Sequence, residues 1–164
     1  DLSKSEIINT VFLKGDHVVN LGFAAGQDWY QYYDKTTFPR ILFAYENCIK
    51  ENLFDNRSFL GIGGFVGGTA TKSSFVDAKQ SFLTIGARSS VHYLFVNKLD
   101  SYAGVLIGTR IIKESSVNYS YSDNELALSI NIGARYYLIE QGAVYVELGL
   151  GTFNYSSLGI SFRF

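Results

Sequence analysis

The sequence is poor in charge, in proline and in sulfur. Asp, Glu, Lys and Arg make up 18% of the chain, and the net charge of −1 offers no basic surface for nucleic acid. The single cysteine, Cys48, excludes an internal disulfide and a cysteine-based zinc site. No apolar run approaches the roughly 18–20 residues that a membrane-spanning helix needs. With two histidines and no G-x-S-x-G motif, we expect no catalytic residues, no metal and no cofactor, and therefore no enzyme.

What the sequence does contain is aromatic residues, glycine and a two-residue alternation. It has 12 Tyr, 13 Phe and 16 Gly against one Pro, a composition that favours long β-strands. Apolar residues alternate with small or polar ones, whereas helical periodicity is missing. We predict eight strands, at about 17–26, 38–48, 58–68, 80–95, 99–112, 125–138, 142–152 and 155–164.

The connections between these strands alternate in length. QDWYQYYDKTT, TATKSSFVDAK and KESSVNYSYSD are long and polar or aromatic, whereas NKLD and EQG are tight. Long connections at one end and short ones at the other are typical of an up-and-down barrel. We therefore predict an all-β fold, an eight-stranded antiparallel up-and-down β-barrel over 16–164, preceded by an N-terminal lead-in over 1–15.

Each predicted strand has one apolar face and one face of small or polar residues. The apolar face, with residues such as Leu21, Ile107 and Leu148, contains no charge. The opposite face is rich in glycine, poor in lysine and charged in the middle of strands, which suits the narrow interior of a small barrel. A water-facing surface would show Lys and Glu along every strand. We therefore predict a transmembrane barrel with its apolar face in lipid, and a soluble lipocalin-like binder is the alternative.

The last eight residues carry the most specific motif. From Ser157 to Phe164 they read polar, any, Gly, any, any, aromatic, any, aromatic, with Gly159, Phe162 and Phe164 at defined positions. This pattern resembles the carboxy-terminal signal of bacterial outer-membrane barrels. The stretches KGDHVVNLGFAAG, FLGIGGFVGG and LDSYAGVLIGTR resemble the small outer-membrane β-barrel proteins of Bacteroidota.

This resemblance implies an integral protein of a Gram-negative outer membrane, made with a cleaved signal peptide. A chain that begins at Asp1 rather than Met agrees with that expectation. An even number of strands would place both termini and the tight turns on the periplasmic side. The implied partners are outer-membrane lipid and the assembly machinery that reads the C-terminal strand. The resemblance implies little about activity.

A set of charged residues follows the predicted interior face. Acids and bases nearly balance, and unpaired charge is costly in a narrow lumen, so we expect an ion-pair network that plugs the barrel. A narrow channel for ions or small solutes is the alternative interpretation of the same residues. The expected members are Glu46, Arg88, His92, Asp100, Arg110, Arg135, Glu147 and Arg163.

Aromatic residues gather in two of the predicted long loops. Tyr and Trp are favoured at membrane interfaces and also at binding hot spots, so these residues form either an anchoring rim or a binding surface. We expect a structural or binding role in the cell envelope, for example as an accessory subunit of a larger outer-membrane complex; an outer-membrane barrel enzyme is a further alternative. The candidate binding residues are Trp29, Tyr30, Tyr32, Tyr33, Tyr119 and Tyr121.

Overall fold

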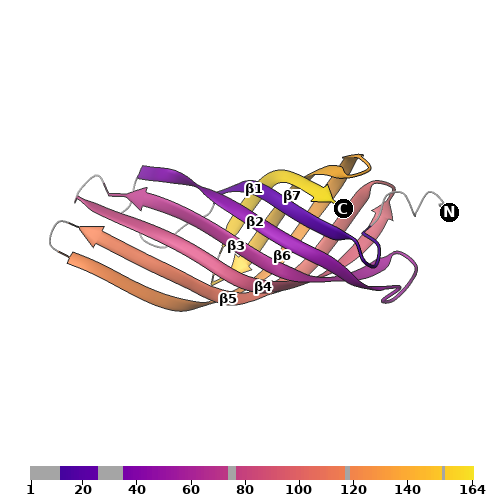
Figure 1. The fold of residues 1–164 in the computed structure, drawn as a ribbon, viewed down its shortest axis with the longest axis horizontal. Helices are drawn as coiled ribbons and strands as arrows, with labels where there is room; N and C mark the ends of the chain where they lie inside the picture. The colour runs from indigo at the N-terminus through magenta and orange to yellow at the C-terminus, as the bar shows by residue number, and fades with distance from the viewer. Residues whose placement is uncertain (1–11, 26–34, 74–76, 117–118, 153) are drawn as a thin grey trace.

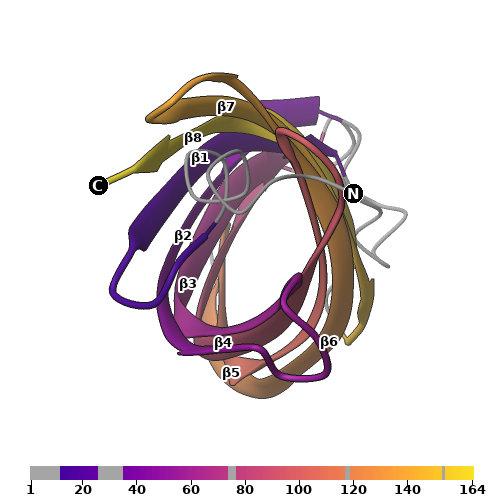
Figure 2. The same ribbon diagram turned by 90° about the vertical axis from the view of Figure 1, so that its right-hand side faces the viewer.

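The computed structural model describes residues 12–25, 35–73, 77–116, 119–152 and 154–164, with the backbone alone for 35–38. Eight antiparallel strands pair in sequence order, and β1 pairs with β8 to close the ring (Figures 1 and 2). The predicted up-and-down barrel is confirmed. The strands are β1 (His17–Ala25), β2 (Lys35–Glu51), β3 (Ser58–Lys72), β4 (Ala78–Val96), β5 (Leu99–Ser116), β6 (Tyr119–Ile139), β7 (Gly142–Gly151) and β8 (Tyr155–Arg163). No helix in the described part of the chain is long and apolar enough to cross a membrane.

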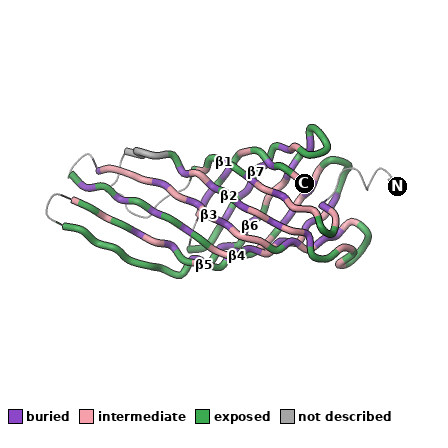
Figure 3. Tube along the Cα trace, in the orientation of Figure 1, coloured by how far each residue is buried: buried purple, intermediate pink, exposed green. Residues whose placement is uncertain are grey.

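The outside of the barrel is apolar. Aliphatic and aromatic side chains point away from the lumen, and Phe23, Ile107, Ile130 and Leu150 are between 57% and 66% exposed. Buried and exposed residues alternate along the strands (Figure 3), as the two-residue period of a β-strand requires. A continuous apolar exterior around a polar interior is stable against lipid rather than water. The soluble lipocalin-like alternative, which needs the opposite arrangement, does not fit this surface.

The two ends of the barrel differ. We call the end with Phe164 and the start of β1 the terminal end, and the opposite one the long-strand end (Figure 1). At the terminal end, the expected tight turns lie at Asn97–Lys98 and Glu140–Gln141. Lys98 has a left-handed backbone with φ of 67°, and the β4–β5 ladder shifts register beside this turn, between Leu94 and Val96, as in hairpins that combine a left-handed residue with a bulge.

At the long-strand end, β2 to β6 continue past the ends of β1, β7 and β8. The ladder between β6 and β7 stops at the pair Ser129 and Gly151, whereas β6 itself extends to Tyr119. The long loops predicted at 69–79 and 113–123 are therefore wrong, because most of their residues continue the strands. Tyr and Thr in these segments favour an extended backbone. Outside lipid, however, a strand needs no apolar face, so the sequence there lacks the alternation by which a membrane strand is recognised. The third predicted loop falls largely on 26–34, outside the described residues.

Three layers of side chains fill the lumen. An apolar cluster of Phe12, Val18, Cys48, Phe59 and Leu94 closes the terminal end. Next along the strands lies a charged layer, formed by Glu46, Arg88, His92, Asp100, Arg135 and Glu147. A second apolar cluster follows it toward the long-strand end, formed by Leu42, Ala44, Phe65, Leu106, Ala127 and Tyr155. Phe12 comes from the segment that the sequence assigned to the lead-in, yet its side chain is fully buried in the barrel.

The lumen is so narrow that adding one methyl group at an inward-facing glycine should destabilise the barrel. Gly133 on β6 is paired with Tyr102 on β5, and a Cβ at Gly133 would lie 2.7 Å from Cε2 of the Tyr102 ring. We expect Gly133→Ala to displace this ring and lower the free energy of unfolding by about 1–3 kcal/mol. Urea denaturation of the barrel refolded in detergent measures this. Gly64→Ala is the control, because its Cβ would meet only the Gly86 carbonyl oxygen at 3.7 Å; an equal loss in both variants would contradict the prediction.

Candidate functional site

Two buried arginines organise the charged layer, and Arg135 on β6 is the more central. Its Nη1 donates to Oδ2 of Asp100 on β5 at 2.9 Å, and its Nη2 donates to Oε2 of Glu46 on β2. Its Nε donates to Oδ1 of Asn20 on β1 at 3.1 Å. Ser161 on β8 donates to the same Asn20 oxygen at 2.6 Å. One guanidinium group thus links four strands other than its own, directly or through Asn20.

Arg88 on β4 binds Glu147 on β7 across the lumen. Its Nη2 lies 3.0 Å from Oε2 and its Nη1 lies 3.4 Å from Oε1, a bidentate geometry that matches the planar guanidinium to the carboxylate. Two hydroxyl groups also donate to Glu147, from Tyr102 at 2.7 Å and from Tyr155 at 2.5 Å. A carboxylate with this many donors is well compensated for the loss of water.

His92 on β4 lies between two carboxylates. Its Nδ1 is 2.9 Å from Oδ1 of Asp100, and its Nε2 is 3.6 Å from Oε1 of Glu46. The connected layer contains three carboxylates and two guanidinium groups, so a doubly protonated imidazole would bring its charge to zero. The position of His92 between Asp100 and Glu46 suits such a doubly protonated ring, since each ring nitrogen faces a carboxylate.

Aromatic rings pack against the charged groups. The guanidinium carbon of Arg135 lies 4.5 Å from the centre of the Tyr102 ring, and that of Arg88 lies 5.7 Å from it. The Phe12 ring covers His92 at a centroid distance of 4.5 Å. These contacts exclude water from the layer and add cation–π attraction to the ion pairs.

Six of the eight predicted network residues lie in this layer, and two do not. Arg110 is ten residues along β5 from Asp100, about 33 Å at the usual rise of a strand. Its guanidinium packs over the Phe82 ring at 4.3 Å. Arg163 lies at the terminal end, where its Nη1 is 3.8 Å from Asp16 and its Nη2 donates to the Glu140 carbonyl at 2.8 Å. Placing these two in one network was wrong, because alternation predicts the face of a strand but not the height along it.

Several partners in the layer were not predicted. Asn20, Tyr102 and Ser161 stood on the polar face in the sequence, but as uncharged residues they gave no signal of pairing. Tyr155 at the start of β8 and Phe12 before β1 lay at segment boundaries. Only the register of the closed ring brings the four strand residues, Asn20, Tyr102, Tyr155 and Ser161, to the charged layer, while Phe12 covers the layer from the apolar cluster beside it.

Of the candidate binding residues, Trp29, Tyr30, Tyr32 and Tyr33 lie outside the described part of the chain. Tyr119 and Tyr121 lie in β6 rather than in a loop, and they are 57% and 44% exposed. Their rings stack at a centroid distance of 6.2 Å, and the Tyr121 hydroxyl donates to Asp123 at 3.0 Å. The two tyrosines form a small exposed aromatic surface at the long-strand end.

The residues of the C-terminal motif lie in β8 or directly after it. Phe162 points outward, is 51% exposed and pairs with Val19 of β1, while Gly159 pairs with Gly22. Phe164 is 69% exposed, and its ring stacks on His17 at 5.6 Å. The strand therefore closes the ring with an apolar outer face, and its role as an assembly signal stays a prediction.

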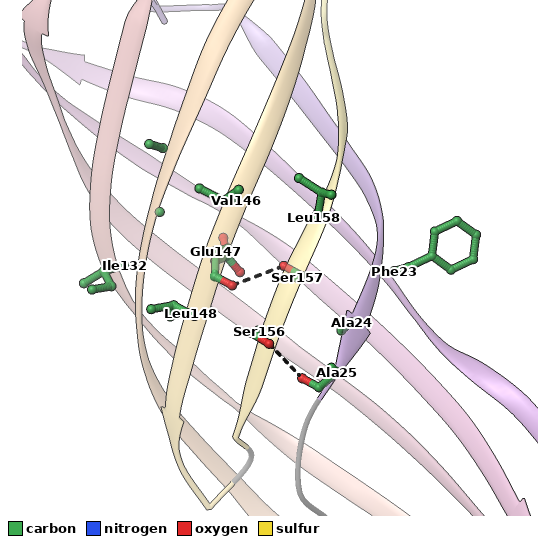
Figure 4. Close-up of a pocket in the computed structure, with 12 residues that line it drawn as sticks. Phe23, Ala24, Ala25, Ile132, Val146, Glu147, Leu148, Ser156, Ser157 and Leu158 are labelled. Atoms are coloured by element: carbon green, nitrogen blue, oxygen red, sulfur yellow. Dashed lines mark hydrogen bonds between the residues drawn. The ribbon is translucent and has the colours of Figure 1, made fainter. Parts of the chain in front are cut away.

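A groove of about 740 Å³ opens on the outside of the barrel wall across β1, β8, β7 and β6 (Figure 4). Its lining is mostly apolar, and Ser156 donates to the Ala25 carbonyl oxygen at 3.3 Å along one side. Glu147 belongs to the lining, but its carboxylate is bonded into the charged layer. The groove offers packing surface to a hydrocarbon chain and no reactive group. Its other lining residues are Phe23, Ala24, Ile132, Gly133, Ala134, Val146, Leu148, Ser157 and Leu158.

Comparisons with solved structures agree with this geometry. Ail, the attachment invasion locus protein of Yersinia pestis, aligns with a TM-score of 0.64 and 17% identity over 93% of this chain and 100% of that one. The outer-membrane protein AlkL aligns with 0.60 and 17% over 94% and 92% of the two chains. The N-terminal barrel of Pseudomonas aeruginosa OprF gives 0.55 and 12% over 92% and 98%. No family model and no curated protein matches the sequence.

The fold is therefore that of the small eight-stranded barrels of the outer membrane. Ail and AlkL are outer-membrane proteins whose structures have been determined in lipid bilayers, in agreement with the location that the sequence predicted. At this level of identity the likeness concerns the fold alone. The resemblance to Bacteroidota proteins in particular stays a prediction.

The charged layer should make a measurable contribution to stability. We expect Glu147→Gln to lower the free energy of unfolding by about 3–5 kcal/mol, because it removes the nearer of the two carboxylates that pair with the buried Arg88 and leaves only Glu46, at 3.4 Å. Urea denaturation in detergent micelles measures the change. Glu140→Gln, at an exposed turn position, is the matched control and should change stability by less than about 0.5 kcal/mol. Equal stability of Glu147→Gln and wild type would show that Arg88 does not depend on this partner.

Proposed function

We propose that this protein is a small integral barrel of the outer membrane that acts as an anchor, a binding protein or an accessory subunit of a larger outer-membrane complex, and that it is not an enzyme. The observation that carries the proposal is the filled lumen. Phe12, Arg135 and Leu106, one from each of the three layers, are at most 1% exposed. A barrel without an open interior has its outer surface available for function.

The channel alternative meets two apolar barriers. An ion or small solute would need a continuous polar path, and eight strands leave an interior just wide enough for side chains. The charged layer is polar, but the clusters around Phe12 and Phe65 lie on either side of it. Conduction would require both clusters to move. For the enzyme alternative, no described group of the charged layer combines a nucleophile with an accessible substrate position.

Conductance measurements test the filled lumen. Because side chains block the path at three levels, we expect the purified barrel in a planar bilayer to show no stepwise openings above the baseline of the bare membrane. A general diffusion porin reconstituted in the same way is the positive control. Reproducible steps from folded wild-type protein would favour the narrow channel and contradict the proposed role.

The outer surface supports a binding role. Tyr119 and Tyr121 are exposed at the long-strand end, and the apolar groove across β1, β8, β7 and β6 provides a second contact area within the wall. Tyrosine supplies large contact area at low entropic cost. The neighbour Ail is called the attachment invasion locus protein and has been crystallised with the heparin analogue sucrose octasulfate. A related role in attachment is one form that the proposed binding function can take here.

Purification from native membranes in a gentle detergent tests for a companion. We expect wild-type protein to retain a stoichiometric partner, and Tyr119→Ser/Tyr121→Ser to retain less of it if the tyrosines contribute contacts. Quantitative mass spectrometry of the purified material measures the ratio. Ser120→Ala/Ser122→Ala is the control on the same strand. If the barrel is always recovered alone, the accessory role is contradicted, and a role as an independent anchor is the form of the proposal that remains.

A further inference from the structure

Lysines stand side by side at the long-strand end. Lys72 on β3 is directly opposite Lys79 on β4, and on its other side it is opposite Lys35 of β2. Lys113 on β5 is opposite Ser81, two residues from Lys79. Directly opposite residues share one face of a sheet, with Cβ atoms about 4.5–5.5 Å apart. We call Lys72, Lys79 and Lys113 the outer lysine row.

The row lies on the outside of the barrel, where the apolar surface ends. Lys79 and Lys113 are exposed, and Lys79 shares its face with the outward Leu83 and Ile85. Lys113 is two residues beyond Ile111 on the same face of β5. In a bilayer this is the level of the headgroups, where a lysine stem can lie along apolar surface while its ammonium group reaches outward.

The charge of the row is poorly balanced by the protein. Like charges directly opposite each other destabilise a β-ladder. Lys72 forms an ion pair with Asp77 at 3.2 Å, with both groups solvent-accessible. Other described acids at this end stand on the inner face: Asp123 is opposite the buried Ile112. Among the described residues of this end, Asp77 is thus the one acid beside the lysine row, and the acids on the strands are on the lumen side.

We propose that the outer lysine row binds the phosphate groups of a phosphorylated glycolipid of the outer leaflet, a lipid of the lipid A type. The phosphates supply the negative charge that the row lacks, and the acyl chains pack on the aliphatic side chains below it, such as Leu83, Ile85 and Ile107. The inference rests on the proposed placement in the outer membrane, with the long-strand end outward. It does not depend on a companion protein or on the state of the lumen.

A lipid titration tests the row. Folded barrel in zwitterionic detergent is titrated with diphosphorylated lipid A and with lipid A stripped of phosphate, and bound lipid is counted by native mass spectrometry. We expect tighter binding of the phosphorylated form. Each lysine removed should weaken it about fivefold, so Lys72→Gln/Lys79→Gln/Lys113→Gln should weaken it on the order of a hundredfold.

Two variants control for charge and for position. Replacing the same three lysines by Arg keeps the charge and should keep the binding within a few-fold. Lys50→Gln, an exposed lysine at the terminal end of β2, should bind as wild type does. The mobility difference between heated and unheated protein in gel electrophoresis reports folding. If the triple Gln variant does not fold, excess Mg²⁺ added to wild type should weaken lipid binding, and no weakening would overturn the proposal.

Three further results would overturn the row as a lipid site. These are equal binding by wild type and the triple Gln variant, equal binding of both lipid forms, or binding of sucrose octasulfate by the row as tight as that of lipid A. The last result would make the row a site for soluble polyanions. Failure of the barrel to enter phosphatidylcholine vesicles would instead overturn the membrane placement, so the two failures are distinguishable.

Discussion

The pairing of β1 with β8 is the constraint on which the rest of this structure depends. In hydrocarbon, every backbone N–H and C=O must find a partner within the protein, and a sheet achieves this only by closing on itself. The ladder from Val18 opposite Arg163 to Ala25 opposite Ser156 completes that closure. Closing the ring with eight strands also fixes the width of the lumen, which must then be filled by side chains.

A filled lumen explains why charge and apolar groups lie in separate layers. A buried ion pair rarely makes a protein more stable than apolar packing of the same volume would. Removing one partner, however, lowers the free energy of unfolding strongly, because the other charge stays buried and unpaired. The layer around Arg135 and Glu147 therefore contributes mainly to the uniqueness of the arrangement: its bonds join every strand except β3 at one level. β3 contributes no side chain to these bonds, and its Gly61 leaves room for the His92 ring. A Cβ at Gly61 would lie 3.1 Å from Nε2 of His92. The apolar layers on either side exclude water and strengthen the pairing.

Alternation in the sequence predicts much of this fold and less of the site. All eight strands follow from it, because a strand in lipid must present an apolar residue at every second position. Beyond the membrane a strand does not need this alternation, and the sequences at the ends of β3 to β6 were therefore predicted to be loops. For the charged layer, parity placed Glu46, Arg88 and Arg135 on the correct face. It could not separate them from Arg110, since height depends on strand tilt and register, which are properties of the closed ring.

The extended strands show where the constraint of closure no longer applies. Past Ser129, β6 has no pairing with β7, and past Arg40 toward its start β2 has none with β1. Edges of this kind are not tolerated in lipid but are allowed in water, which can satisfy their free backbone groups. The sequence no longer needs an apolar exterior there, and the outer lysine row and the exposed Tyr119 and Tyr121 lie in this part. Residues that bind a ligand can be accommodated at this end of the molecule, because residues in the membrane part are constrained by closure of the ring and by packing in the lumen.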